Sequence, residues 1–164
     1  MVSPEARAAA LDRVLARAEA MLRPLGEAEM DRRVPPGGRA LRDLGFALFR
    51  GALGFVDAMD GGGWRDAWLD ERAPDDLRDG GAVTRYGALV RARLGGWFEG
   101  AGPGEYQRMI DTDAGPRSGR DLLDAALARA DRAAHDLAAA IASLGVGPGA
   151  SATDQSIGRT TRNP

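Results

Sequence analysis

The side chains that can do chemistry in this sequence are carboxylates, hydroxyls and arginines. The chain has 164 residues, with no cysteine, no lysine and a single histidine, His135. A thiolate nucleophile, a Schiff-base lysine, a cysteine-rich zinc site and a multi-histidine metal centre are therefore excluded, because each needs atoms that the chain lacks. A site here must work through acids, hydroxyls or the permanent charge of arginine.

Proton transfer could fall to several acids and tyrosines. The candidates are Asp43, Glu105, Tyr106, Asp111 and Tyr86. A carboxylate whose pKa is raised by burial can act near neutral pH, but the sequence does not reveal burial and so does not select among them. The aromatic residues Tyr86, Trp97 and Phe98 are typical of a core, with a stacking platform as the alternative.

The charge balance argues against nucleic acid as a partner. Twenty-two basic residues, all arginine, face 24 acidic residues, for a formal net charge of -2. A nucleic-acid-binding surface usually needs a basic excess on one face. The sequence contains no run of about 18 apolar residues that could span a membrane. Residues 1–25 lack the pattern of a signal peptide. We therefore expect a soluble, cytoplasmic protein.

Apolar residues recur at helical spacing in four segments, which predicts an all-α four-helix bundle with long crossovers. The four helices are expected from Pro4 to about residue 23, from Arg39 to about Met59, from about Gly80 to Phe98 and from Ser118 to Leu144. Ser3 and Ser118 are the expected N-caps. The second helix contains three interior glycines, Gly45, Gly51 and Gly54, which indicate either close packing or open space for a ligand.

The segments between these helices are expected to be loops. Trp64 and Trp68 lie on an excursion over the bundle, where they could form a helical turn or cover a pocket, and residues 105–112 are predicted to be extended. Residues 1–145 are expected to form the bundle domain. Residues 146–164 are expected to be a disordered tail, because they are small and polar.

Three strings, in the right order, resemble the DinB-like superfamily of small bacterial four-helix bundles. They are VPPGGRALRDLGFALFR (34–50), VRARLGGWFEGAGPGEYQRMIDT (90–112) and SGRDLLDAALARADRA (118–133), and the resemblance spans roughly residues 10–145. Members of that superfamily typically bind a divalent metal through three histidines. The resemblance also implies that this chain has relatives that are S-transferases or isomerases using low-molecular-weight thiols.

The resemblance places the three ligand positions at Ala47, Arg129 and Ala133, none of which is histidine. A shifted alignment puts Asp131 and His135 at the paired positions instead. Both pairs have the i,i+4 spacing that brings two side chains to one helix face, but the shift breaks the leucine register and leaves Ala47 without a donor atom. We therefore expect no metal and no other cofactor.

Loss of three imidazoles would leave a pocket between the second, third and fourth long helices. Arg129 could then replace the charge of the metal by gripping a carboxylate, phosphate or enolate oxygen, or it could be a solvated surface arginine. Arg50 and Asp43 are the other expected catalytic residues, since the three could form one ionic cluster. The residues expected to contact substrate are Ala47, Ala133, Tyr86, Trp97 and Glu105.

Two functions remain open at this point. The first is a metal-independent enzyme acting on a small molecule, of transferase, isomerase or cyclase type, suited to specialised biosynthesis. The second is a non-catalytic protein that binds a small molecule or a protein partner after losing the metal site. Homodimerisation through a helix face is left open by the sequence.

Overall fold

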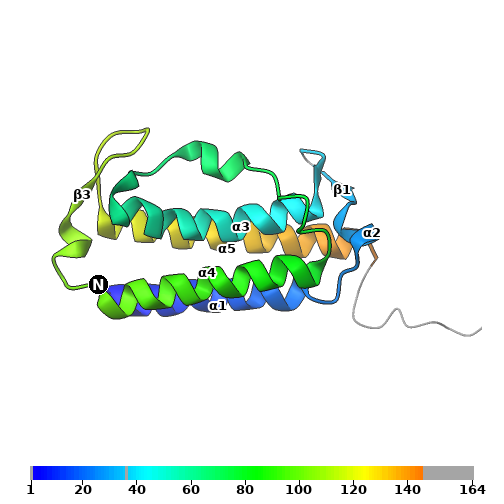
Figure 1. Ribbon diagram of the computed structural model, residues 1–164, viewed down its shortest axis with the longest axis horizontal. Coiled ribbons are helices and arrows are strands. Elements are labelled where there is room, and N and C mark those ends of the chain that lie inside the picture. Colours follow the sequence, from blue (N-terminus) through cyan, green and yellow to red (C-terminus); the bar gives the residue numbers. More distant parts are fainter. Residues whose placement is uncertain (1, 36, 146–164) are drawn as a thin grey trace, which may run out of the picture.

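Four long helices form the bundle in the computed structural model, which describes residues 2–35 and 37–145 (Figure 1). They are α1 (Pro4–Leu22), α3 (Leu41–Asp57), α4 (Gly80–Gly100) and α5 (Gly119–Ser143). Helices α1 and α5 run in one direction, and α3 and α4 run in the other. Both α1 and α3 pack against α4 and α5. The predicted all-α bundle is confirmed, and the predicted tail at 146–164 lies outside the described residues.

The two predicted N-caps are confirmed. The Ser3 hydroxyl accepts a hydrogen bond from the amide of Ala6 at 3.2 Å, and the Ser118 hydroxyl accepts one from the amide of Asp121 at 3.1 Å. Each satisfies an amide that the first turn of a helix leaves without a partner. The starts of α1 and α5 were therefore predictable from local sequence.

Short elements occupy the three connections. They are α2 (Glu27–Met30), β1 (Arg33–Val34), β2 (Arg39–Ala40), the π-helical turn η1 (Ala58–Gly62), the 3-10 turns η2 (Asp66–Asp70) and η3 (Glu105–Gln107), β3 (Met109–Ile110) and β4 (Arg117–Ser118). Strand β1 pairs with β2 and β3 pairs with β4, both antiparallel. The two hairpins lie at opposite ends of the bundle (Figure 1).

The expectation of an extended segment over 105–112 is wrong in its first half. The amide of Glu105 donates to the carbonyl of Gly102 at 3.1 Å, and that of Gln107 donates to Gly104 at 3.2 Å. These bonds, each between residues three apart, wind the chain into η3. By contrast, the expected helical turn after Trp64 is confirmed as η2, which packs against α3.

The glycines of α3 serve close packing. A β-carbon at Gly45 would lie 2.9 Å from a methyl of Leu22, and one at Gly54 would lie 2.8 Å from the rings of both Trp64 and Trp68. Both distances are shorter than a normal carbon–carbon contact. Gly54 therefore lets the Trp64 loop lie directly on the bundle.

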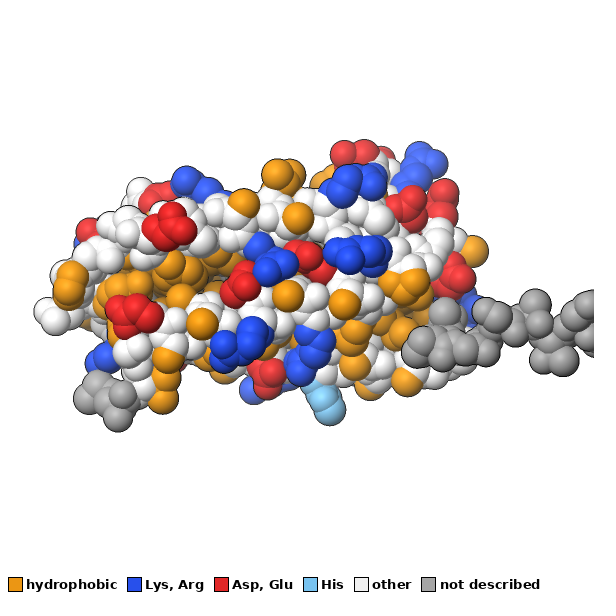
Figure 2. All heavy atoms as spheres, turned by 90° about the horizontal axis from the view of Figure 1, so that it is seen from below, with side chains coloured by type: hydrophobic (Ala, Val, Ile, Leu, Met, Phe, Trp, Pro, Cys, Tyr) orange, Lys and Arg blue, Asp and Glu red, His pale blue; other side chains and the backbone are white. Residues whose placement is uncertain are grey.

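An ion-pair network joins α1 to α4. The guanidinium of Arg91 donates to both carboxylate oxygens of Asp12, at 2.7 and 3.0 Å, and to Glu19 Oε2 at 3.3 Å. Glu19 is buried, while Asp12 is half-exposed. Figure 2 shows the face formed by α1 and α4, where basic and acidic side chains alternate along the middle of the bundle.

This network predicts a specific loss of stability in acid. The hydrogen bond from Arg91 lowers the pKa of Asp12 from its ordinary value of 3.8. A carboxyl with a lowered folded-state pKa stabilises the fold above its unfolded pKa and loses that contribution as pH falls through the folded value. We expect Asp12→Asn to cost less than about 1 kcal/mol at neutral pH and to flatten the acid branch of the unfolding curve. Urea titrations from neutral pH down to below pH 3.8 check this, and an acid branch as steep as that of the wild type would contradict it.

No helix among the described residues is long and apolar enough to cross a membrane.

Candidate functional site

The three positions that the resemblance assigned to metal ligands lie around one cavity. Ala47 comes from α3, Arg129 and Ala133 come from α5, and the cavity has a volume of about 250 Å³. Its other lining residues are Arg39, Leu44, Leu48, Leu69, Arg132, Asp136 and Leu137. Leu69 belongs to η2, so the excursion over α3 supplies one wall. We predicted a contribution from the third long helix, α4, and no described α4 residue lines the cavity.

Arg129 lies on the face of an indole ring. Its Cζ is 4.1 Å from the ring centroid of Trp64, whose Nε1 donates a hydrogen bond to Asp66 Oδ1 at 2.8 Å. Trp64 is 3% exposed and therefore fixed in place. This cation–π contact holds the guanidinium on the inner side of α5, so the alternative of a fully solvated surface arginine is wrong.

Two nitrogens of this guanidinium have no hydrogen-bond partner. Nε and Nη2 of Arg129 are both buried, and no described group accepts from either. Burial lowers the pKa of Arg129, Asp66 opposes the shift, and the nearby Arg117 adds to it. An arginine remains protonated at neutral pH, so the site holds a half-buried cation with two buried, unused donors.

The other charged residues of the cavity leave a positive excess. Arg39 donates to the backbone carbonyls of Leu69 and Glu71, both at 3.5 Å, and makes no ion pair with a described carboxylate. Arg132 is exposed and likewise has no ion-pair partner among the described residues. Against three arginines, Asp136 is the one carboxylate in the described lining. The cavity is therefore suited to an anion.

The other predicted catalytic residues do not reach this cavity. Arg50 forms ion pairs with Asp57 at 3.1 Å and with Glu71 at 3.0 Å, and it covers Trp68. Asp43 accepts a hydrogen bond from the amide of Ala73 at 2.9 Å. Both side chains thus have partners within the protein, and the cluster expected from Arg50, Asp43 and Arg129 does not form.

The predicted substrate contacts at Tyr86, Trp97 and Glu105 also lie outside the lining. Tyr86 stacks on Phe46 at 5.1 Å between ring centroids, and burial raises its pKa while the charge of Arg50 opposes the rise. Trp97 packs edge to face on Phe55 at 5.1 Å. Glu105 forms an exposed ion pair with Arg108 at 3.0 Å. The two aromatic residues are part of the packing of α4.

The residues at the predicted ligand positions do not fit a divalent metal ion. Alanine offers no donor atom, and the guanidinium of Arg129 would repel a cation. The alternative pair is also unsuited, since Asp131 faces Arg17 at 3.4 Å and His135 is exposed. Figure 2 shows the histidine projecting from the surface. Across residues 2–35 and 37–145, no group of three or more acidic or histidine side chains could hold a metal.

Sequence reasoning missed several residues of this site. Arg132 and Asp136 each lie three residues after a predicted position, so helical spacing from Arg129 and Ala133 could have found them. Leu69 and the ring of Trp64 arrive from the excursion between α3 and α4. Their place depends on how that segment folds back, and no local signal gives it.

The fold and the cavity together define an up-down-down-up four-helix bundle with a polar-rimmed pocket between α3 and α5. This is the fold of DinB-like proteins. A DinB-like protein from Bacillus subtilis superposes with a TM-score of 0.66 at 11% identity, over 85% of this chain and 92% of that chain. One from Bacillus cereus superposes with a TM-score of 0.70 at 8% identity, over 87% and 93%. At such identities the likeness is one of fold.

No protein-family model matches this sequence, and no curated protein does.

Proposed function

We propose that the cavity between α3 and α5 binds a small organic anion and that the protein acts on it as a metal-independent enzyme of transferase, isomerase or cyclase type. The observation that carries this proposal is the guanidinium of Arg129, which is held against Trp64 with two buried nitrogens unpartnered. A buried donor without an acceptor costs free energy, and a carboxylate or phosphate would satisfy both nitrogens at once when the guanidinium turns from Trp64 toward the cavity.

The cavity lining supports ligand binding over a purely structural role. Small side chains at Ala47 and Ala133 leave space where larger residues would close the interior. Its mixture of leucines with a few charged groups is typical of small-molecule sites. A bundle that only needed stability would gain more from filling this space.

The chemistry open to this site is electrostatic. Arg129 can stabilise negative charge that develops on a carbonyl or enolate oxygen, and the shaped walls can orient one substrate. Asp136 supplies the one carboxylate in the described lining and is therefore the candidate general base. Isomerisation and cyclisation need no more than these groups.

A second candidate is a non-catalytic binding protein. It is favoured by the lining itself, in which the described residues include no hydroxyl, thiol, amine or imidazole. Recovery of a bound ligand, unchanged after prolonged incubation, would support this second role, whereas a changed ligand would support the enzyme. Homodimerisation and a cytoplasmic location stay predictions.

The test is a calorimetric titration of the untagged protein with acetate, benzoate and inorganic phosphate. We expect at least one to bind, and Asp136→Asn to tighten its binding by about twofold, because this change removes a negative charge roughly 10 Å along the helix from Arg129. Asp131→Asn is the matched control, since Asp131 pairs with Arg17 outside the cavity. Failure of every anion to bind, or equal effects of the two variants, would argue against the proposal.

A further inference from the structure

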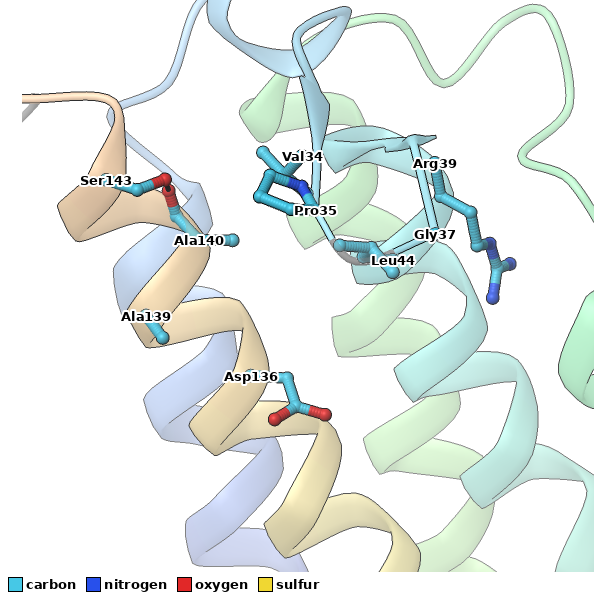
Figure 3. Close-up of a pocket in the computed structure, with 9 residues that line it drawn as sticks. All are labelled: Val34, Pro35, Gly37, Arg39, Leu44, Asp136, Ala139, Ala140 and Ser143. Carbon is cyan, nitrogen blue, oxygen red and sulfur yellow. Dashed lines mark hydrogen bonds between the residues drawn. The ribbon is translucent and has the colours of Figure 1, made fainter.

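A second cavity continues the first along α5. It has a volume of about 390 Å³ and shares Arg39, Leu44 and Asp136 with the cavity of Arg129. Figure 3 shows it between the end of α5 and the β1–β2 hairpin, with Val34 and Pro35 facing Ala140. Because the two cavities share three lining residues, they adjoin one another along α5, and together they are called the groove.

The groove is long and changes character along its length. From Arg129 to Ser143 the helix rises by about 20 Å. The end at Arg129 holds the unpartnered guanidinium, whereas the far end is lined mainly by apolar groups. In Figure 3 the guanidinium of Arg39 points away from Ala139 and Ala140, so the charge of Arg39 does not interrupt the apolar wall.

The polar atoms at the far end are largely used within the protein. The hydroxyl of Ser143 donates to the carbonyl of Ala140 at 2.6 Å, and Arg39 donates to the backbone carbonyls of Leu69 in η2 and of Glu71 just after it. Val34 is 2% exposed and Ala140 is 8% exposed, so this wall is fixed in the fold. Such a wall offers an occupant apolar contact more than hydrogen bonds.

We propose that the ligand of this protein is an elongated carboxylate, with its anionic group at Arg129 and an apolar chain lying toward Ala140 and Pro35. This inference rests on the proposed function and narrows it to a substrate class. Charge complementarity places the carboxylate, because Arg129 has free donors and Asp136 repels an anion from the middle of the groove. The apolar remainder then has one direction to follow along the groove, toward the hairpin.

The test compares unbranched carboxylates of increasing length, from acetate through butanoate and octanoate to dodecanoate, by calorimetric titration of the whole chain. We expect affinity to rise by about two- to fourfold for each added methylene until the groove is filled. Ala140→Phe should abolish this dependence on length while leaving acetate binding unchanged. Ala139→Trp, at an exposed lining position, gives the same information if the first variant does not fold.

Ala138→Trp is the matched control, because Ala138 is exposed on the same helix and lies outside both linings. If binding to the wild-type protein does not depend on the length of the carboxylate, the proposal of an elongated ligand is wrong, while the proposed anion site is unaffected. Failure of all carboxylates, the shortest included, would overturn the elongated carboxylate, and failure of inorganic phosphate as well would overturn the anion site. Equal effects of Ala138→Trp and Ala139→Trp would also contradict the placement of the chain.

Discussion

Replacement of Arg129 by methionine should make the protein more stable and, at the same time, unable to bind anions. Two buried nitrogens without partners each cost about 1–3 kcal/mol, and the contact with Trp64 returns about 0.5–2 kcal/mol. We therefore expect the free energy of unfolding to rise by about 1 kcal/mol, because methionine can cover the indole without a charge. Urea unfolding measures the change in stability. Calorimetric titration with an anion that the wild-type protein binds measures the loss of binding.

The combination of the two effects is what identifies a binding residue. Removal of an arginine that stabilises the fold should lower the free energy of unfolding. Removal of an arginine that is kept for a ligand should raise it. Arg85→Met is the control, since Arg85 is exposed on α4 and lies outside the described cavity linings, and it should change neither quantity. A less stable Arg129→Met protein that still binds the anion would remove Arg129 from the site.

A single methyl group at Gly80 should destabilise the protein by at least about 2 kcal/mol. A β-carbon there would lie 1.7 Å from the backbone carbonyl oxygen of Leu22, and the Gly80 amide also donates to the carbonyl of Leu25 at 2.8 Å. The start of α4 is thus docked on the end of α1 by backbone atoms that cannot swing aside. Thermal and urea unfolding of Gly80→Ala measure the loss.

Replacement of glycine by alanine at another position of α4 should instead stabilise the protein. Gly96 is exposed, and a β-carbon there would meet no atom within 4 Å. Because alanine is the better helix former, Gly96→Ala should stabilise the protein by about 0.5–1 kcal/mol. A Gly80→Ala protein that is stabilised as Gly96→Ala is would show that helix propensity, and not contact, decides the effect at Gly80.

The helices were predictable because their signals are local. Ser3, Ser118 and the spacing of leucines set the ends and the buried faces without reference to the rest of the chain. The turn η3 was missed because its signal is not local. Glycine-rich segments have several low-energy conformations, and packing against the rest of the protein selects one.

The site was predictable only in the part that lies on helices. Ala47, Arg129 and Ala133 were brought to one cavity as the resemblance implied, because helical spacing fixes which side chains share a face. The partner of Arg129 could not be found in this way. Trp64 reaches it from a loop 65 positions earlier in the chain, on a path that Gly54 permits by lacking a side chain. The prediction that Tyr86, Trp97 and Glu105 contact substrate was wrong, because the sequence does not distinguish an aromatic or acidic residue that packs in the fold from one that binds a ligand.

The alanines of the cavity make this bundle a scaffold for protein engineering. Ala47, Arg129 and Ala133 surround one space, and two of them are four residues apart on α5. Histidines at these positions would supply three imidazoles from two helices, which is a donor set that zinc accepts. A metal-binding bundle and the present one can thus differ by three side chains along an unchanged backbone path. The protein could therefore be converted toward metal chemistry without redesign of its fold.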